Sequence, residues 1–447
     1  MHVPLAALTG PLHATLLGSD APIERLVTDS REARPGDLFV PLVAERDGHD
    51  FVASAFSGGA TATLWSRDAG ALQLPDGAGA LVVADTSAAL DDLARFARGR
   101  TSARVVGITG SVGKTTVKDL VAEVLGRRLR VSASERSFNN EIGVPLTVFN
   151  APGDCEALVV EMGARGPGHV AALCELARPQ IGVVTVVAGA HLECFGDLAG
   201  VAVAKGELIE ALPADGTAVL NFDDPLVAAM AERSDAEVLT FGRSGGDVRA
   251  EAVRLGDDLR ASFRLESPWG AAQVRLAIAG EHHVTNALAA AAVGLDAGVP
   301  VDLVADALGT AGISPWRMEM ALTPGGATVI NDAYNANPTS TGAALSALAS
   351  LPARRRVAVL GEMAELGPDA RALHLEVVEL AGELGVEVLA VGTDAYGVEP
   401  IGLDRAADVL ESLTADEAAL VKGSRVAGLE RLVQRVVQPA DSDPGSR

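Results

Sequence analysis

The sequence is poor in aromatic residues and in cysteine, and it contains no long uninterrupted apolar run. Its three cysteines, Cys155, Cys174 and Cys194, show no metal-ligand spacing, which argues against a metal cluster and favours reduced thiols. No apolar run reaches the ~18 residues that a membrane span needs. The N-terminus also lacks a basic segment ahead of a long apolar stretch, so it does not resemble a signal peptide. We therefore expect a soluble, cytoplasmic protein.

Positive charge is scarce as well. The chain has 36 Lys and Arg against 59 Asp and Glu, a formal net charge of −23. This balance argues against non-specific binding to nucleic acid or to anionic membranes. An anionic ligand must then be held by local backbone amides, by Mg²⁺ and by a few basic side chains. The 447 residues, 48% of them apolar, are enough for several cores and predict about three domains at roughly 150 residues each.

One stretch organises the chain. Residues 105–116 read Val-Val-Gly-Ile-Thr-Gly-Ser-Val-Gly-Lys-Thr-Thr, an apolar strand pattern followed by a glycine-rich turn and the start of a helical pattern at Lys114. Glycines let the backbone approach a polyphosphate, and the amides at a helix N-terminus point at the anion. Lys114 is expected to reach the β- and γ-phosphates and Thr115 to bind Mg²⁺. Ile108 replaces the first glycine of the strict Walker pattern, so this is a variant nucleoside triphosphate site.

The hydrophobic pattern predicts an α/β chain of three domains. We expect a small N-terminal α/β domain over 1–101, a central P-loop domain with a parallel sheet over 102–314, and a Rossmann-like α/β domain over 315–447. Residues 244–278 suggest an antiparallel addition to the central sheet. Ligands gather at the carboxyl ends of parallel strands, and Glu161 lies at such an end.

The third domain ends in a predicted helix over 425–436, after which the residues from Pro439 on are expected to be disordered. Before this domain, Ser314-Pro315-Trp316 is a predicted hinge, because proline stops the preceding helix and restricts the residue before it.

Short motifs along the whole chain resemble the Mur ligase family. In chain order they are 107–116, Phe138-Asn139-Asn140-Glu141-Ile142-Gly143-Val144-Pro145, Glu161-Met162-Gly163-Ala164, His191-Leu192-Glu193, Ala204-Lys205-Gly206-Glu207, Gly280-x-His282, Asn286 and Arg317-Met318-Glu319. Three further motifs resemble one branch of the family, the branch that adds a D-alanyl-D-alanine dipeptide. They are Asp332-Ala333-Tyr334-Asn335-Ala336-Asn337-Pro338, Leu360-Gly361-Glu362-Met363 and Lys422-Gly423-Ser424-Arg425.

The resemblance implies an ATP-dependent amide ligase with small-molecule substrates. ATP would phosphorylate the terminal carboxylate of UDP-N-acetylmuramoyl-tripeptide to an acyl phosphate, which the amine of D-alanyl-D-alanine then attacks. The product is the pentapeptide precursor of peptidoglycan, made in the last cytoplasmic step of its synthesis. We expect no nucleic-acid partner and a monomer.

The resemblance also implies roles for individual residues. The residues with implied catalytic roles are Lys114, Glu161, His191, Lys205 and Arg317. Those implied to bind ATP are Gly110, Ser111, Gly113, Lys114, Thr115, Thr116, Asn286 (adenine), Arg317 (γ-phosphate) and Asp332 (ribose). Those implied to bind the other substrates are Ser30 and Arg31 (uridine diphosphate), Asn139 and Asn140 (sugar and peptide), and Asn335 and Asn337 in the third domain. Asn335 and Asn337 suit turns equally well.

Two Mg²⁺ ions are implied, the first on Thr115 and Glu161 and the second on Glu161, His191 and Lys205. Lys205 stands among small and apolar residues, and an ammonium beside a dication is strongly repelled. Burial and that field favour the neutral amine, the form that reacts with CO₂. We therefore predict a carbamate on Lys205 as a ligand of the second ion.

Two positions depart from the family pattern. His283 stands where the family more often has Asn, beside the implied adenine contact. Ala44 replaces a usual glycine before Glu45, which weakens the case for the loop at Arg46 as a substrate contact.

Two other readings remain open. One is a sister amide ligase, such as the tripeptide-stage enzyme or a folate polyglutamate ligase, although the Asp-Asn-Pro-Arg-like motif typical of the tripeptide-stage enzyme is not found. The other is a nucleotide-gated binding protein with a decayed site, against which the intact Lys114, Glu161, His191 and Lys205 argue. Release of ADP and phosphate only when both acceptor and amine are present separates these cases.

Overall fold

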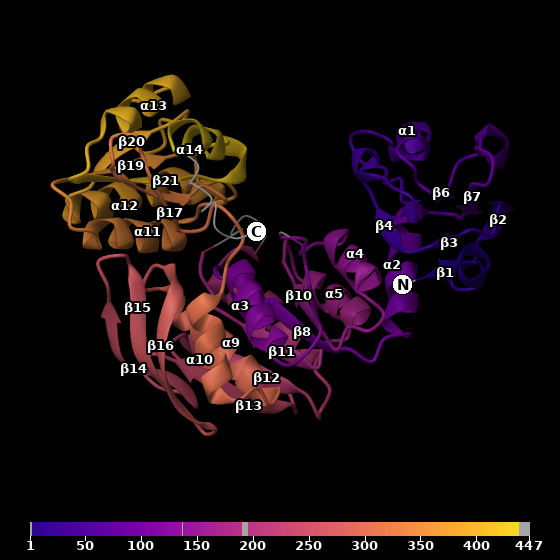
Figure 1. The fold of residues 1–447 in the computed structure, drawn as a ribbon, viewed down its shortest axis with the longest axis horizontal. Helices are drawn as coiled ribbons and strands as arrows, with labels where there is room; N and C mark the ends of the chain where they lie inside the picture. Colours follow the sequence, from indigo (N-terminus) through magenta and orange to yellow (C-terminus); the bar gives the residue numbers. More distant parts are fainter. Residues whose placement is uncertain (1, 136, 190–194, 438–447) are drawn as a thin grey trace, which may run out of the picture.

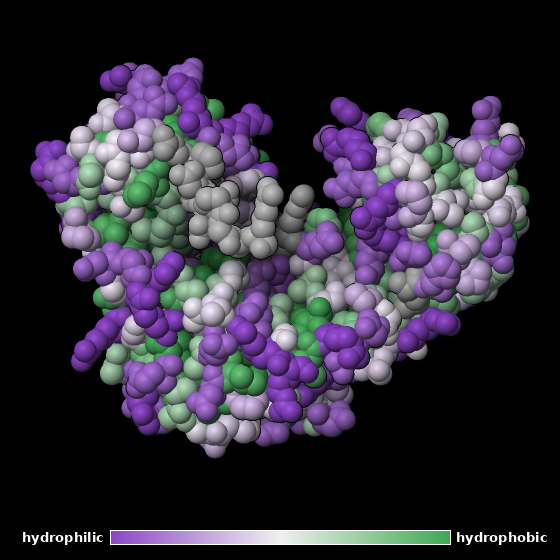
Figure 2. All heavy atoms as spheres, in the orientation of Figure 1, coloured by the Kyte–Doolittle hydropathy of each residue, from purple (hydrophilic) through white to green (hydrophobic). Residues whose placement is uncertain are grey.

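The computed structural model describes residues 2–135, 137–189 and 195–437 (Figure 1). The expected C-terminal disorder from Pro439 on falls outside these residues. The mixed α/β class is confirmed, with three separate parallel or mostly parallel sheets. We call the parts that carry them the N-terminal unit (2–98), the central unit (104–310) and the C-terminal unit (319–437). The N-terminal and C-terminal units lie at opposite ends of the central unit, and Figure 2 shows the surface hollowed between them.

The sheet of the N-terminal unit has the order β2-β7-β6-β5-β4, with β2 antiparallel at one edge and the other strands parallel. Its strands are β2 (Thr15–Gly18), β4 (Arg25–Val27), β5 (Asp37–Phe39), β6 (Ala62–Trp65) and β7 (Gly79–Val82). A separate pair joins β1 (Val3–Pro4) to β3 (Pro22–Ile23), and the helices are α1 (Val52–Ser57) and α2 (Thr86–Arg98). Helix α2 is capped by Asp85, whose carboxylate accepts from the amides of Ser87 and Ala88.

The N-terminal unit is anchored on the central one. The apolar face of α2 packs against helices α4 (Gly143–Asn150) and α5 (His169–Ala177) of the central unit, within one shared hydrophobic core. The Asn150 side-chain amide donates to the carbonyl of Leu26, and its oxygen accepts from the Leu26 amide at 2.7 Å. Arg98 donates from Nε to the carbonyl of Ala177 at 2.7 Å. These contacts attach both strand β4 and the C-terminal end of helix α2 to the central unit.

The central sheet has the order β16-β15-β14-β13-β12-β11-β8-β10-β9. Its strands are β8 (Arg104–Thr109), β9 (Val131–Ala133), β10 (Ala157–Glu161), β11 (Ile181–Val184), β12 (Thr217–Asn221), β13 (Glu237–Gly242), β14 (Val248–Leu255), β15 (Arg260–Ser267) and β16 (Gly270–Ala279). Strands β8 to β13 run parallel, whereas β14, β15 and β16 form antiparallel pairs, which confirms the predicted addition.

Helices cover both faces of the central sheet because residues of its buried strands alternate between two cores. Val105 contributes to the core under α5 and α7 (Leu198–Glu210), and Val106 contributes to the core under α3 (Lys114–Gly126), α9 (His283–Asp296) and α10 (Val301–Thr310). Helices α3 and α9 pack so closely that a Cβ on Gly294 would lie 2.2 Å from Val124. A short helix, α8 (Pro225–Ala228), follows β12.

The C-terminal sheet has the order β17-β18-β21-β19-β20, parallel except for β17 at one edge. Its strands are β17 (Glu319–Leu322), β18 (Thr328–Asp332), β19 (Arg355–Leu360), β20 (Glu387–Ala390) and β21 (Glu417–Lys422), and its helices are α11 (Pro338–Ser350), α12 (Ala370–Glu383), α13 (Leu403–Ser412) and α14 (Glu430–Val436). The prediction of a single helix over 425–436 is wrong. A 3-10 turn (Arg425–Ala427) is separated from α14 by Gly428, whose φ of 63° is left-handed. Among the described residues, none of the helices has both the length and the apolarity to cross a membrane.

Candidate active site

A cavity of about 1180 Å³ lies where the carboxyl ends of the central strands face the C-terminal unit. Most of the residues implied to bind or transform ATP line it, and they come from segments far apart in the chain. Those predicted residues are Gly110, Ser111, Gly113, Lys114, Thr115, Thr116, Asn139, Asn140, Glu161, Lys205, Asn286, Arg317, Asp332, Asn335 and Asn337. His191 lies outside the described residues.

The phosphate loop has the predicted strand–turn–helix form, with β8 before it and α3 after it. Gly110 has a φ of 143°, and a Cβ there would lie 1.9 Å from Thr185 Oγ1. Gly113 has a φ of 88°, and a Cβ there would lie 2.6 Å from Asn286 Oδ1. Both glycines are therefore required for conformation and for space. The first amides of α3 consequently open onto the cavity, where an anion is favoured.

Lys114 follows the last glycine of this loop. Its Nζ donates to the carbonyl of Gly110 at 2.8 Å. Burial lowers the pKa of Lys114, and the nearby Glu161 carboxylate opposes that shift. The side chain is thus folded back on the loop, in reach of a phosphate bound by the same loop.

Thr115 and Glu161 form the centre of the site. Thr115 Oγ1 donates to Glu161 Oε2 at 2.8 Å, and Asn139 Nδ2 donates to Glu161 Oε1 at 2.8 Å. A hydroxyl and a carboxylate side by side are the hard oxygen donors that Mg²⁺ prefers. In the described parts of the chain, no cluster of three or more His, Cys, Asp or Glu side chains forms a metal site. The pair suits an ion whose remaining ligands are phosphate oxygens and water, as is usual for Mg²⁺.

Ser137 belongs to this centre, and the sequence reasoning missed it. Its Oγ lies 3.1 Å from Thr115 Oγ1, and it lines the cavity. Because the Thr115 hydroxyl donates to Glu161, the Ser137 hydroxyl is the donor in this contact. Its place directly before the Phe138-Asn139-Asn140 motif was the available signal.

Arg317 reaches the same centre from the segment that joins the central and C-terminal units. Its Nη2 donates to Thr115 Oγ1 at 2.9 Å. Asp332, which the resemblance assigns to the ATP ribose, accepts from the Met318 amide at 3.2 Å through Oδ1 and pairs with Lys422 through Oδ2. Lys422 is buried and also donates to the carbonyl of Asn335 at 2.9 Å. Asp332 is therefore tied to protein groups before any ligand binds.

Lys205 is buried in α7, with a relative exposure of 2%. Burial lowers the pKa of Lys205 to about 7, and the nearby charge of Lys114 adds to the shift. Within the described residues it has no hydrogen-bond or ion-pair partner. The Glu207 carboxylate opposes this shift, and near pH 7 a substantial share of the amine is neutral.

The start of α9 provides a second polar edge of the cavity. Asn286 Nδ2 donates to His283 Nδ1 at 3.0 Å, which leaves the proton of the neutral ring on Nε2. His283 Nε2 is buried and has no partner. Burial holds the pKa of His283 well below its usual value, and the adjacent His282 adds to this. His283 and Asn286 are both among the residues that line the cavity.

Several asparagines predicted to bind substrate have local structural bonds. Asn140 Oδ1 accepts from the Gly143 amide at 2.9 Å at the start of α4. Asn337 forms a capping box with Ser340 at the start of α11. Asn335 is exposed. Both residues therefore have the local bonds of turn residues, because Asn335 Oδ1 also accepts from the Ala336 amide at 2.9 Å.

Ser30 and Arg31 lie in the N-terminal unit, at the carboxyl end of β4, and do not line the central cavity. Arg31 donates from Nε to Asp29 Oδ1 at 2.9 Å and is largely exposed. Any ligand that contacts both these residues and Glu161 must therefore be long enough to extend from one unit to the next.

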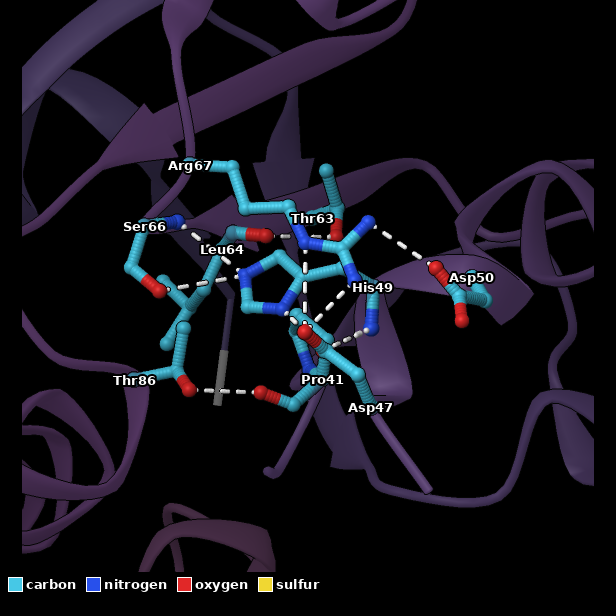
Figure 3. Close-up of polar contacts among 9 residues, drawn as sticks. All are labelled: Pro41, Asp47, His49, Asp50, Thr63, Leu64, Ser66, Arg67 and Thr86. Carbon is cyan, nitrogen blue, oxygen red and sulfur yellow. Dashed lines mark hydrogen bonds and ion pairs between the residues drawn. The ribbon is translucent and has the colours of Figure 1, made fainter. Parts of the chain in front are cut away.

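A polar network orders the same edge of the N-terminal sheet (Figure 3). Asp47 Oδ1 accepts from the His49 amide at 3.0 Å and from His49 Nδ1 at 2.6 Å. His49 Nε2 accepts from the amide and the hydroxyl of Ser66, both at 3.1 Å. Arg67 donates to Asp47 and Asp50. The bonds from the His49 amide, from Arg67 and from the His49 ring hold the pKa of the Asp47 carboxyl well below its usual range. His49 Nε2 already accepts from the Ser66 backbone amide. We therefore assign this hydrogen-bond network a structural role, in which it holds the loop after β5 against the end of β6.

Comparison with known proteins agrees with the fold and identifies the family. Residues 108–294 match the Mur ligase middle domain, and residues 316–443 match the Mur ligase, glutamate ligase domain. The chain belongs to the Mur ligase family, a family of ATP-dependent ligases.

Particular members are similar over nearly the whole length. The UDP-N-acetylmuramoyl-tripeptide–D-alanyl-D-alanine ligase of Mycobacterium tuberculosis is 40% identical, over 99% of this chain and 98% of that protein. The structure of MurF from Acinetobacter baumannii is 29% identical with a TM-score of 0.87, over 97% of this chain and 98% of that one. MurF from Thermotoga maritima, in complex with ADP, is 30% identical with a TM-score of 0.80, over 92% and 96% of the two chains.

Proposed function

We propose that this ligase joins D-alanyl-D-alanine to UDP-N-acetylmuramoyl-tripeptide with the hydrolysis of ATP to ADP and phosphate. The names of its full-length relatives support these substrates. The structural observation that carries the proposal is the single cavity in which the phosphate loop, Glu161, Lys205 and Arg317 meet. We place the reaction in the cytoplasm, where it completes the pentapeptide precursor of peptidoglycan, and we propose a monomer.

The first step brings together two anions, the acceptor carboxylate and the γ-phosphate of ATP. The carboxylate oxygen attacks phosphorus, the bond to ADP breaks, and an acyl phosphate forms. The amides at the start of α3 and the Lys114 ammonium hold the phosphates, and Arg317 adds a third positive group from the other side. Mg²⁺ bound to the phosphates supplies further charge neutralisation, and Thr115 and Glu161 are the residues that hold it.

In the second step the neutral amine of D-alanyl-D-alanine attacks the acyl carbon. The carbon–nitrogen bond forms, phosphate leaves with the bonding electron pair, and the nitrogen loses a proton. The acyl phosphate must be shielded from water until the amine arrives. Asn335 and Asn337 of the C-terminal unit line the same cavity as the phosphate loop, and they are our candidates for contacts to the dipeptide.

We further propose a second Mg²⁺ held by Glu161, His191 and a carbamate on Lys205. Lys205 supports this assignment because it is buried, unpaired among the described residues, and close enough to neutral to react with CO₂. The carbamate nitrogen–carbon bond forms with loss of one proton, and the anion replaces a repelled ammonium.

The rest of the acceptor extends away from this centre. We assign Asn139 and Asn140 to its sugar and peptide portion, and Ser30 and Arg31 to the uridine diphosphate. The N-terminal unit is joined to the central unit through α2, which makes it the natural support for the far end of a long acceptor. Asn286 and Asp332 remain our candidates for adenine and ribose.

The test is a product assay on purified protein with ATP and Mg²⁺. We expect ADP, phosphate and the pentapeptide only when both UDP-N-acetylmuramoyl-tripeptide and D-alanyl-D-alanine are present. Tripeptides with diaminopimelate and with lysine at the third position are compared side by side. Faster ligation of free D-alanine or diaminopimelate than of the dipeptide would contradict the assignment and favour a sister ligase.

A further inference from the structure

Arg317 lies close to the phosphate loop, and no carboxylate among the described residues pairs with it. Its Nη2 donates to Thr115 Oγ1 at 2.9 Å and lies 3.4 Å from Ser137 Oγ. Its Nε is buried and has no hydrogen-bond partner, and it forms no ion pair within the described residues. A guanidinium beside Lys114 is repelled by that ammonium. Something other than an ion pair must keep it in the site.

The ring of Tyr334 covers the guanidinium. The Cζ atom of Arg317 lies 4.2 Å from the centre of this ring. A cation over the face of an aromatic ring within ~6 Å is attracted by the ring quadrupole. Tyr334 stands in the loop after β18, and its amide donates to the carbonyl of Trp316 at 3.2 Å. The same residue thus holds both the side chain of Arg317 and the backbone immediately before it.

The backbone around Arg317 is held in an uncommon conformation. Trp316 has a φ of 63° and Met318 a φ of 50°, both left-handed and neither glycine. Such residues are strained and persist where their surroundings hold them in place. The Met318 amide is held by Asp332, which is itself paired with Lys422. The loop that begins at Asp332 therefore forms hydrogen bonds with the residue before Arg317 and with the residue after it.

We propose that Tyr334 is a positioning residue of the ligase reaction, whose ring presents the guanidinium of Arg317 to the phosphates bound by the central unit. The proposal rests on the proposed function, because it takes the γ-phosphate of ATP as the ligand of Arg317. A carboxylate partner would neutralise the guanidinium and occupy its donors. An aromatic ring fixes one face and leaves the charge and the remaining donors of the guanidinium free for a phosphate.

Two other roles for Tyr334 make different predictions. A merely structural ring would support the fold, and its loss would affect the binding of all nucleotides together with thermal stability. A ring that contacts the nucleoside directly would matter equally for ADP and ATP. A ring that acts through Arg317 matters only for the ligand that carries a γ-phosphate and only while Arg317 is present.

The experiment is a double-mutant cycle with Tyr334→Leu, Arg317→Met and the double variant, and with Tyr334→Phe as the matched control. Calorimetry in Mg²⁺ measures the Kd of ADP and of a non-hydrolysable ATP analogue, and steady-state assays measure kcat and the KM for ATP. We expect Tyr334→Leu to weaken binding of the ATP analogue about tenfold and to leave ADP unchanged. Tyr334→Phe should remain within about twofold of the unmodified protein, because it keeps the ring face.

In the Arg317→Met background, Tyr334→Leu should cost nothing further in binding or in kcat. Additive losses in the double variant, equal weakening of ADP and the ATP analogue, or a Tyr334→Phe protein as impaired as Tyr334→Leu would each overturn the proposal. If Tyr334→Leu does not fold, phenylalanine with a progressively fluorinated ring at position 334 keeps the shape and removes the negative charge of the ring face. Selectivity for the ATP analogue over ADP should then fall with each fluorine, and an unchanged selectivity would overturn the proposal.

The cycle also separates this inference from the proposed function. If the unmodified protein binds ADP and the ATP analogue but forms no product from the tripeptide and dipeptide, the substrate assignment fails and the positioning role still stands on the binding data. If the unmodified protein is active and the cycle is additive, only the role of Tyr334 fails.

Discussion

Thr115 Oγ1 donates to Glu161 Oε2 at 2.8 Å, so the first turn of α3 and the end of β10 share one hydrogen bond. Both side chains are nearly fully buried, with relative exposures of 3% and 1%. The pair links the start of α3, whose amides suit an anion, to the carboxylate at the end of β10. Removing either side chain therefore breaks one hydrogen bond of the other in a buried position, while the contacts of Glu161 to Asn139 and of Thr115 to Arg317 remain.

The first prediction concerns the hydroxyl of Thr115. Thr115→Val keeps the shape of the side chain but removes the donor to Glu161 Oε2 and the proposed metal ligand. We expect kcat to fall by about 100-fold or more, as for loss of a transition-state electrostatic contact. Thr115→Ser is the matched control and should stay within a few fold. A Thr115→Val protein with near-normal turnover in the ADP-release assay would exclude a role for this hydroxyl.

A second prediction separates nucleotide binding from chemistry. Lys114→Ala should remove most phosphate affinity, because the Lys114 ammonium is the basic group folded over the loop. Glu161→Ala should retain part of the nucleotide affinity and lose turnover, because this carboxylate is assigned to both metal ions. Calorimetric ATP binding and product assays on the two variants measure this contrast. Near-normal turnover of Glu161→Ala would contradict the two-metal assignment.

A third prediction concerns the chemistry of Lys205. Lys205→Ala should lose most activity, and short carboxylic acids should restore part of it by filling the vacated oxygen position. Lys205→Met, which is closer to lysine in shape, should also lose most activity. Depletion of CO₂ should lower the activity of the unmodified protein and leave both variants unchanged. A fully active Lys205→Ala protein would rule out the carbamate.

Lys205 also predicts a pH dependence of stability. Its folded-state pKa is about 7 against an ordinary value of 10.5. Between these values the unfolded chain binds more protons at this residue than the folded one, so its contribution to the free energy of unfolding rises with pH. Urea unfolding at pH 7 and pH 9.5 in CO₂-free buffer should show a steeper rise for the unmodified protein than for Lys205→Met. An equal rise in the free energy of unfolding with pH for the two proteins would mean that the pKa of Lys205 is not lowered in the folded state.

A fifth prediction tests the loop of the N-terminal unit. The folded-state pKa of Asp47 is lowered by the His49 amide, by Arg67 and by the His49 ring. Its contribution to stability is therefore present above the unfolded pKa of about 4 and is lost as pH falls through the folded value. Asp47→Asn should be less stable at neutral pH, and its difference from the unmodified protein should shrink between about pH 5 and pH 2. Asp50→Asn, which removes only a contact to Arg67, is the control and should show little of this dependence.

The phosphate loop and the order of strands and helices were predictable because their signals are local. Residues 105–116 contain the strand, the two conformationally required glycines and the helix start in one continuous stretch. The helix Thr86–Arg98 also has local signals, since Asp85 caps it and an apolar stripe follows. Lys205 was also predicted to be enclosed, from its small and apolar neighbours.

What escaped prediction depends on segments that meet only in the folded chain. Nothing local marks Tyr334 as the partner of Arg317, because β18 and its loop fold back beside the joining segment. The helix predicted over 425–436 failed because an apolar pattern continued across Gly428, and the left-handed conformation of that residue is visible only in the structure. The tie between Asp332 and Lys422 likewise pairs the ends of neighbouring parallel strands that lie far apart in sequence.

The tight packing of α3 on α9 has a consequence for how this enzyme tolerates change. One helix begins at the phosphate loop and the other at His283 and Asn286, and they touch again deep in the core where Gly294 meets Val124. The span between the two polar edges of the nucleotide cavity is thus set by apolar residues more than two helical turns away from it. A methyl group added at Gly294 would push the starts of α3 and α9 apart. A substitution in the apolar core, far from the cavity, would therefore weaken nucleotide binding.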